Sequence, residues 1–221
     1  VANGESYIGS DVPAILKYTR DVYYIGNQEM ARVRKGEITF YNLDGDEIEK
    51  ELKTVEWDAE AAEKAGYEHF MIKEIHEQPK AVSDTLNSVV KDGAIDLSEV
   101  GLSEEEIKEI SQIYIVACGS AYHVGVAAQY VMEDLARIPV RVELASEFRY
   151  RNPILDPKGL VIIISQSGET ADSLAALRES KKQGVKTLGI VNVIGSSIAR
   201  EADNVFYTLA GPEIAVATTK A

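Results

Sequence analysis

Apolar residues recur in short uninterrupted runs along the second half of the chain. These runs occupy residues 113–117, 140–144, 160–164, 187–191 and 204–208, and mostly amphipathic segments separate them. Strands that are apolar throughout are buried on both faces, which is typical of a parallel sheet covered by helices on each side. The pattern therefore predicts an α/β fold. Ligands of such sheets bind beyond the carboxyl ends of the strands, which directs attention to residues 118–122, 165–170, 192–197 and the final segment.

The first part of the chain has a different pattern. Strand-like segments at 21–26, 29–34, 37–42 and 47–55 are separated by turn dipeptides such as Asp44-Gly45, and they predict an antiparallel meander. Residues 10–16 indicate a capped single helical turn before it. A sheet of roughly fifty residues has a marginal core in isolation. We therefore expect it to be the end of a larger domain.

Residues 57–66 are rich in Asp, Ala, Glu and Lys without hydrophobic periodicity, which predicts a linker. Helical offsets follow from residue 67 to 75 and resume from 79 to 90. Pro79 is expected to start or kink a helix and not to lie in its middle. Ser103 with Glu106 three residues later predicts a capping box.

The strongest chemical signal is the turn after the apolar run 160–164. A helix is predicted over 171–182, so residues 165–170 lie at its start, where free backbone N–H groups and the macrodipole favour an anion. Ser165, Ser167 and Thr170 add hydroxyl donors, and Gly168 lets the backbone approach closely. One hydroxyl here would be an ordinary helix cap. Three hydroxyls and a glycine exceed that need and predict a phosphate-binding turn.

A second turn follows the run 113–117, where Gly119 and Ser120 begin a helix predicted to extend to about residue 136. Alone, this turn is weak evidence for a ligand site. However, like the turn at 165–170 it connects a buried strand to a helix, and this shared position supports one site formed by both turns. Neither turn carries G-x-G-x-x-G or a Walker lysine, which disfavours a dinucleotide or a P-loop site.

Several neighbouring residues leave alternatives open. Glu169 would repel phosphate, so it either points away or orients sugar hydroxyls or a neighbouring subunit. Residues 195–197 are better explained as the cap of a short helix at 198–202 than as a ligand site. Arg149 and Arg151 either pair with acidic side chains or lie on a solvated surface.

The composition of the chain argues against several classes of protein. The chain has 221 residues and a formal net charge of −13 without a dense basic run, which argues against nucleic-acid binding. Apolar runs long enough for a membrane span and a secretory signal are both missing from the sequence. The single cysteine, Cys118, excludes an intrachain disulfide and suggests a reducing cytoplasm. A buried structural thiol is expected at this position in preference to a nucleophile, and the three histidines lack metal-ligand spacing.

Four ordered motifs carry a family resemblance. They are Tyr-x-His-x-Met-x-Lys-Glu-Ile-x-Glu-Gln-Pro at 67–79, Ala-Cys-Gly at 117–119, Ala-Ser-Glu-Phe-Arg-Tyr-Arg at 145–151 and Ser-Gln-Ser-Gly-Glu-Thr-Ala-Asp at 165–172. Together they resemble the glutamine:fructose-6-phosphate aminotransferase (isomerizing) family, also called glucosamine-6-phosphate synthase. Residues 10–46 are similar to the last strands of that family's glutaminase domain.

The resemblance implies a domain plan and a site. Residues 1–56 would be the C-terminal part of the glutaminase domain, 57–66 a linker, and 67–221 most of a first sugar isomerase (SIS) subdomain with a flavodoxin-like parallel sheet. The ligand would be fructose 6-phosphate or glucosamine 6-phosphate. By position in the motifs, the substrate-binding residues would be Gly119, Ser120, Ser165, Gln166, Ser167, Thr170, Val216 and Thr218. The family often has Cys-Gly-Thr-Ser at 118–121, so Ala121 lacks one hydroxyl.

The resemblance also implies what lies elsewhere. The family's catalytic groups would fall outside these residues, so we expect an incomplete enzyme that is inactive alone, with no cofactor and no metal. Lys220 is expected at the surface and not as a Schiff-base lysine. A cytoplasmic homodimer paired through SIS subdomains is expected. Two alternatives are a non-catalytic SIS module that senses a sugar phosphate and a purely structural dimerisation piece.

Overall fold

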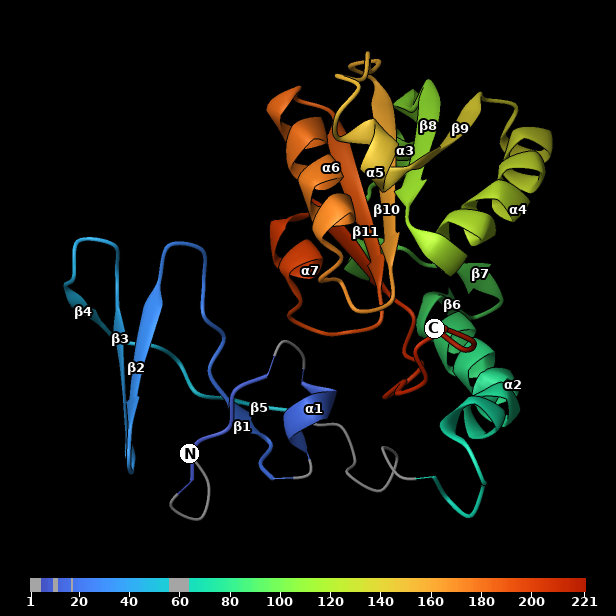
Figure 1. The fold of residues 1–221 in the computed structure, drawn as a ribbon. Helices are drawn as coiled ribbons and strands as arrows, with labels where there is room; N and C mark the ends of the chain where they lie inside the picture. Colours follow the sequence, from blue (N-terminus) through green and yellow to red (C-terminus); the bar gives the residue numbers. More distant parts are fainter. Residues whose placement is uncertain (1–4, 10–11, 17, 56–63) are drawn as a thin grey trace. The chain divides into compact units, whose positions relative to one another are not determined.

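The computed structural model describes residues 5–9, 12–16, 18–55 and 64–221. The chain forms two compact units, Val1–Phe70 and Met71–Ala221, and Figure 1 shows their elements. The predicted cap at Ser10 and Asp11 and most of the predicted linker lie outside the described residues.

The first unit contains short antiparallel pairings. Strands β2 (Met30–Arg34), β3 (Glu37–Tyr41) and β4 (Glu47–Ile48) form a sheet in that order among the described residues. The helical turn α1 (Pro13–Leu16) lies where the sequence predicts one. The predicted strands at 29–34 and 37–42 are thus confirmed as neighbours.

The prediction for residues 21–26 is wrong in length and pairing. Strand β1 covers only Asp21–Val22 and pairs with β5 (Lys53–Thr54), not with β2. The Glu29 carboxylate accepts a hydrogen bond from the Gly26 N–H at 2.6 Å, and Lys50 contacts the same carboxylate at 2.7 Å. Because a side chain takes the Gly26 amide, that amide is not paired with a neighbouring strand.

The second unit is built on one parallel sheet in the described part of the chain. Its strands are β8 (Gln112–Ala117), β9 (Val140–Leu144), β10 (Gly159–Ser165), β11 (Lys186–Val191) and β12 (Asn204–Tyr207). They lie in the order β12-β11-β10-β8-β9, and every pairing is parallel. The predicted α/β class is confirmed. The chain winds in opposite directions from β8 and β10, so the switch point for ligand binding lies between these two strands.

Apolar side chains cover both faces of the sheet. On one face Val116 and Ile163 pack with Leu177 and its neighbours on α5 (Ala145–Phe148), α6 (Ala171–Lys182) and α7 (Ser197–Glu201). On the other face Ile115 and Ile162 pack with residues of α4 (Gly119–Ala136) and of the segment around the 3-10 helix η2 (Ser98–Val100). The alternation along β8 and β10 produces these two cores because successive strand residues point to opposite faces.

Smaller elements precede the sheet. Helix α3 (Glu104–Glu109) begins with the predicted capping box, in which Ser103 Oγ accepts from the Glu106 N–H at 3.2 Å and Glu106 accepts from the Ser103 N–H at 2.8 Å. Strands β6 (Val90–Lys91) and β7 (Ala94–Ile95) form a short hairpin. None of the helices within the described ranges combines the length and apolar character that a bilayer crossing requires.

Helix α2 (Phe70–Val89) contradicts the expectation for Pro79, which lies in the middle of one continuous helix. A proline there removes one N–H and leaves the carbonyl of Ile75 without its usual donor. Both Pro79 and Ile75 lie on the exposed side, where water can hydrogen-bond that carbonyl. The helix therefore continues through the proline.

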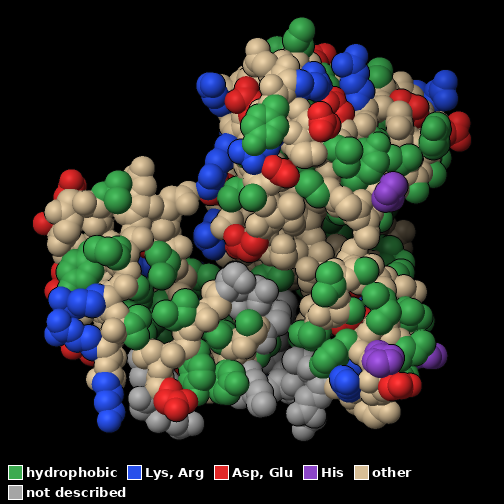
Figure 2. All heavy atoms as spheres, viewed as in Figure 1, with side chains coloured by type: hydrophobic (Ala, Val, Ile, Leu, Met, Phe, Trp, Pro, Cys, Tyr) green, Lys and Arg blue, Asp and Glu red, His purple; other side chains and the backbone are tan. Residues whose placement is uncertain are grey.

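Charged side chains of both signs are interspersed on the face of the second unit that Figure 2 shows. Arg149 contacts Asp172 at 2.7 Å and Arg151 contacts Glu143 at 2.5 Å. The two arginines of the third motif thus take the first alternative, pairing with acidic side chains.

Candidate functional site

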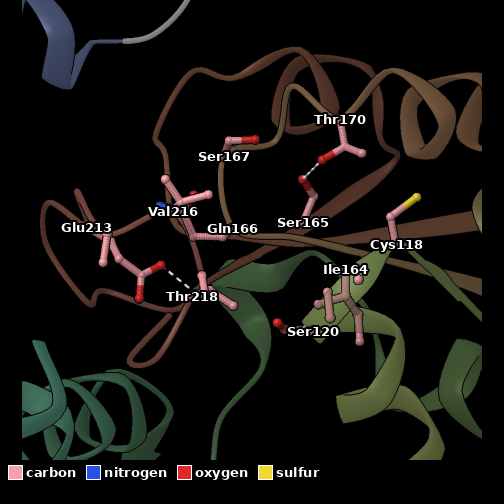
Figure 3. A pocket seen from close by; sticks show the side chains of 14 residues that line it. Cys118, Ser120, Ile164, Ser165, Gln166, Ser167, Thr170, Glu213, Val216 and Thr218 are labelled. Carbon is pink, nitrogen blue, oxygen red and sulfur yellow. Dashed lines mark hydrogen bonds between the residues drawn. The ribbon is translucent and has the colours of Figure 1, made fainter. Parts of the chain in front are cut away.

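A pocket of about 310 Å³ opens at the switch point between β8 and β10. Three segments of the second unit line it: the turn after β8, the turn after β10 and the loop that follows β12 (Figure 3). All of the site residues predicted from the sequence are in its wall. The complete lining is Cys118, Gly119, Ser120, Ala121, Ile164, Ser165, Gln166, Ser167, Thr170, Glu213, Ala215, Val216, Ala217 and Thr218.

The turn after β10 is organised by its own hydroxyl groups. Ser165 Oγ lies 2.9 Å from Thr170 Oγ1 and accepts from the Gly168 N–H at 3.1 Å, and Ser167 Oγ accepts from the Glu169 N–H at 3.2 Å. Figure 3 shows Ser165 and Thr170 facing each other at the pocket.

These bonds leave hydrogen-bond donors for a ligand. The bond between Ser165 and Thr170 uses one of their two hydroxyl hydrogens, so the other stays available whichever oxygen donates. Ser167 accepts in its recorded bond and keeps its own hydrogen. Ser165 and Ser167 thus receive bonds from backbone N–H groups, and within the described residues none of the three hydroxyls donates to a carbonyl. An anion in the pocket would meet O–H donors at the start of α6.

Gly168 is required where it stands. Its φ is +66°, and a Cβ at this position would lie 2.0 Å from Ser196 Oγ and 2.5 Å from Ser196 Cβ. Its carbonyl accepts from the Ile198 N–H at 3.0 Å, which fixes the turn against the start of α7. A glycine thus permits both the left-handed backbone and the close approach to α7.

Glu169 points away from the pocket. Its carboxylate accepts from the Ser197 N–H at 2.7 Å, so it caps α7. This supports the first of the alternatives for this residue, and it places a negative charge where the dipole of a helix start favours it. Ser196 occupies the N-cap position of α7, but its side chain makes no capping bond. The short helix predicted after residues 195–197 is present, with Glu169 as its side-chain cap.

The turn after β8 supplies the opposite wall. Gly119 has a φ of +57°, and Cys118 is the N-cap residue of α4 without a side-chain capping bond. Ser120 and Ala121 follow in the first turn of the helix and line the pocket. Cys118 packs against the core formed by α5, α6 and α7, but it is only half-buried and lines the pocket, so it is less buried than expected.

The loop after β12 contains a residue that sequence reasoning missed. Glu213 is buried, and its carboxylate accepts from the Thr218 hydroxyl at 2.5 Å and from the N–H groups of Thr219 and Lys220 at 2.7 and 3.0 Å. Figure 3 shows Glu213 and Thr218 facing each other. The only signal in the sequence is its position, a few residues beyond the carboxyl end of the last strand. These bonds join Glu213 to residues 218–220, and Val216 and Thr218 of the same loop line the pocket.

The surface position expected for Lys220 is wrong. Its side chain is only 3% exposed, and its Nζ lies 2.7 Å from Glu77 on α2. Lys73 reaches the same side chain at 3.1 Å. Burial alone would raise the pKa of Glu77, but hydrogen bonds and charges from Lys220 and Lys73 outweigh it and lower that pKa below its ordinary value. Lys220 is thus a buried ion-pair partner of α2.

Nowhere in the described part of the chain do three His, Cys, Asp or Glu side chains gather closely enough to hold a metal ion. The side chains that line the pocket offer hydroxyls, an amide, a thiol, a carboxylate and apolar surface.

The SIS domain family model matches residues 106–221, which include the whole parallel sheet and all three walls of the pocket. The chain belongs to the SIS domain family. The similarity to the aminotransferase family predicted from the four motifs is confirmed by curated relatives. A glutamine–fructose-6-phosphate aminotransferase (isomerizing) from Caldanaerobacter subterraneus subsp. tengcongensis is 57% identical over 222 residues, covering 100% of this chain. One from Methanosarcina mazei is 48% identical over 222 residues, again 100% of this chain. The chain spans 36% of the length of each.

Solved structures give the same picture of the SIS fold. The C-terminal domain of glucosamine-fructose-6-phosphate aminotransferase from Francisella tularensis matches with 48% identity and a TM-score of 0.67, over 72% of this chain and 44% of that one. The tagatose-6-phosphate ketose/aldose isomerase of Escherichia coli, at 18% identity and a TM-score of 0.55, covers 66% of this chain and 41% of its own. The second similarity concerns the fold alone.

Proposed function

We propose that the pocket binds a phosphorylated hexose, fructose 6-phosphate or glucosamine 6-phosphate, as the phosphosugar-binding part of a glutamine–fructose-6-phosphate aminotransferase. The names of the relatives supply the substrate class. The observation that carries the proposal is the set of unused hydroxyl hydrogens on Ser167 and on the Ser165–Thr170 pair at the start of α6.

The phosphate would be held by neutral donors. The described lining of the pocket contains no Lys or Arg, and its carboxylate, on Glu213, is occupied by three donors from residues 218–220. Glu169 directs its charge to α7. Hydroxyl and N–H donors with the positive end of a helix dipole suit a phosphate dianion, as at other helix starts. We place the phosphate at residues 165–170 for this reason.

The sugar would extend between the other two walls. Gly119 and Ser120 come from the first turn of α4, and Val216 and Thr218 from the loop after β12. Their mixture of hydroxyls, backbone groups and an apolar side chain suits a polyol chain that is part polar and part C–H surface. Ala121 offers no hydroxyl, so Ser120 and backbone groups would make the contacts on that side.

The remaining assignments follow the relatives as proposals. The whole protein would make glucosamine 6-phosphate from fructose 6-phosphate and glutamine, with residues 1–56 as the end of its glutaminase domain. Pairing of SIS subdomains into a homodimer and a cytoplasmic location belong to the same proposal.

Ligand-dependent stability tests the proposed binding. The chain is titrated with fructose 6-phosphate, with glucosamine 6-phosphate and with unphosphorylated fructose while thermal unfolding is followed. A ligand that binds only the native state raises the melting temperature as its concentration exceeds Kd. We expect both phosphosugars to do so and fructose to have no effect.

Variants locate the effect. Ser167→Ala with Thr170→Ala should abolish the shift, whereas Ser83→Ala, an exposed serine on α2 outside the pocket, should keep it. No shift with either phosphosugar, or an equal shift with fructose, would show that the pocket does not bind a phosphosugar.

A further inference from the structure

The motif at 67–79 lies outside the pocket, yet helix α2 holds one of the pocket walls. Glu74 is fully buried, at 0% exposure, and does not line the pocket. Its Oε1 accepts from the N–H groups of Ile214 and Ala215 at 2.6 and 3.1 Å, and its Oε2 accepts from the Ala215 N–H at 3.3 Å. The carboxylate thus binds the loop backbone just before Val216.

Two further side chains of α2 hold the other end of the same loop. Glu77 accepts from Lys220 Nζ at 2.7 Å, and the Gln78 amide donates to the Thr219 carbonyl at 2.7 Å. Glu77 and Gln78 lie three and four positions after Glu74, so all three lie on one face of the helix. One face of the helix therefore bonds to the loop at both of its ends.

The residues between these two sets of bonds are those that face the pocket. Ala215, Val216, Ala217 and Thr218 line it, and residues 208–221 form no helix or strand. A segment without regular structure depends on side-chain bonds to keep its backbone in one conformation. If a loop is ordered before its ligand binds, the free energy of binding is not reduced by the entropic cost of ordering that loop.

We propose that Glu74, assisted by Glu77 and Gln78, is a positioning residue that preorganises loop 213–220 as the sugar-facing wall of the pocket. This inference rests on the proposed binding of a phosphosugar. It gives the motif Lys-Glu-Ile-His-Glu-Gln at 73–78 a physical role, because three of its polar side chains, Glu74, Glu77 and Gln78, bond to the loop and do not line the pocket.

Binding measurements on four variants of the whole chain test the proposal. They are Glu74→Gln, Glu77→Gln, Gln78→Ala and, as the matched control, Asp84→Asn. Asp84 is a carboxylate on the same helix, and among the described residues it pairs with exposed Lys80 and not with the loop. In Glu74→Gln an amide NH2 replaces one acceptor oxygen and faces N–H donors of the loop. We expect Kd for fructose 6-phosphate to rise about tenfold, the loss of roughly one charged hydrogen bond.

Inorganic phosphate serves as a second probe, because it should contact the turn 165–170 without needing the loop. Its Kd should change less than about twofold in Glu74→Gln, whereas general destabilisation would weaken both ligands alike. Hydrogen exchange of the amides at 214–220 should become faster in Glu74→Gln and stay unchanged in Asp84→Asn. If Glu74→Gln does not fold, Glu77→Gln and Gln78→Ala carry the same test at the other end of the loop.

The outcomes separate this inference from the proposed function. Fructose 6-phosphate binding that is kept in Glu74→Gln but lost in the double variant Ser167→Ala with Thr170→Ala would overturn the positioning role and leave the function standing. Equal weakening of fructose 6-phosphate and inorganic phosphate would overturn it as well. If the wild-type chain binds no phosphosugar, the proposed function fails. Unchanged exchange at 214–220 in Glu74→Gln would refute the grip on the loop independently of any ligand.

Discussion

Gly168→Ala is expected to damage the phosphate turn through two separable effects. Alanine at a φ of +66° costs about 1–2 kcal/mol because its Cβ crowds the backbone in the left-handed region. The new Cβ would also lie 2.0 Å from Ser196 Oγ, and overpacking of this kind costs about 1–3 kcal/mol. The second unit should therefore lose about 2–5 kcal/mol of unfolding free energy.

A double-mutant cycle with Ser196→Gly separates the two effects. Glycine at 196 removes both atoms that the new Cβ would strike, and the next neighbour, a Val191 methyl, lies at an ordinary 3.4 Å. The Ser196 hydroxyl is buried without a hydrogen-bond partner among the described residues and makes no capping bond, so its loss alone should cost only a few tenths of a kcal/mol. In the Ser196→Gly background, Gly168→Ala should cost only the backbone part, about 1–2 kcal/mol.

Urea unfolding, monitored by circular dichroism, gives the free energy of unfolding with and without Gly168→Ala in both backgrounds. The transition midpoints and slopes are compared. The same proteins are titrated with fructose 6-phosphate, and Gly168→Ala should weaken binding because the turn must move away from α7. An equal cost of Gly168→Ala with Ser196 and with Gly at 196 would refute the steric reasoning. A cost below about 1 kcal/mol in the wild-type background would refute the backbone reasoning as well.

Substitutions at three further positions have defined outcomes. Leu177→Ala, at a fully buried core position, should cost about 2–5 kcal/mol in urea unfolding, and a cost below about 1 kcal/mol would contradict the packing described for that face of the sheet. Glu169→Ala removes the side-chain cap of α7 and should cost about 1 kcal/mol, whereas Glu169→Gln, which keeps an acceptor for the Ser197 N–H, should cost less; equal losses would argue against capping. A hydrogen bond from Lys186, followed by bonds from Ser103, lowers the pKa of Glu106 from 4.5 to about 2. Because the folded pKa is the lower one, its stabilisation is present above pH 4.5 and lost as the pH falls toward 2, so the difference in melting temperature between wild type and Glu106→Gln should shrink over that interval; a constant difference would contradict the assignment.

The parts of the fold that could be predicted from the sequence are those set by local pattern. Each apolar run of the second unit is a strand of the parallel sheet, and the helix predicted over 171–182 has those bounds. The capping box of Ser103 and Glu106 is equally predictable, because its bonds join residues only three positions apart.

The errors concern contacts between distant residues. Lys220 can be buried because its ammonium group pairs with the Glu77 carboxylate, more than a hundred residues earlier in the chain. The local sequence around Lys220 does not reveal that partner. Strand β1 pairs with β5 across a stretch that contains the whole three-stranded sheet. Pro79 stays inside α2 because the carbonyl that it leaves unpaired lies on an exposed side, which propensity alone does not reveal.

The candidate site shows the same division. Ser165, Ser167 and Thr170 are predictable because three hydroxyls and a glycine follow a buried strand directly. Glu213 and Glu74 are not, since both bind loop backbone, and Glu74 reaches it only through the tertiary fold. Both carboxylates bond to the backbone of the loop that lines the pocket. Such bonds to the backbone produce no characteristic spacing of residues that a single sequence would show.

A crystal structure of the chain with glucosamine 6-phosphate would test the central claim most directly. We predict phosphate oxygens within hydrogen-bond reach of Ser167 and of the Ser165–Thr170 pair, with the sugar lying between residues 119–121 and 216–218. Density for the phosphosugar at another place, or an empty pocket at saturating ligand, would contradict the account.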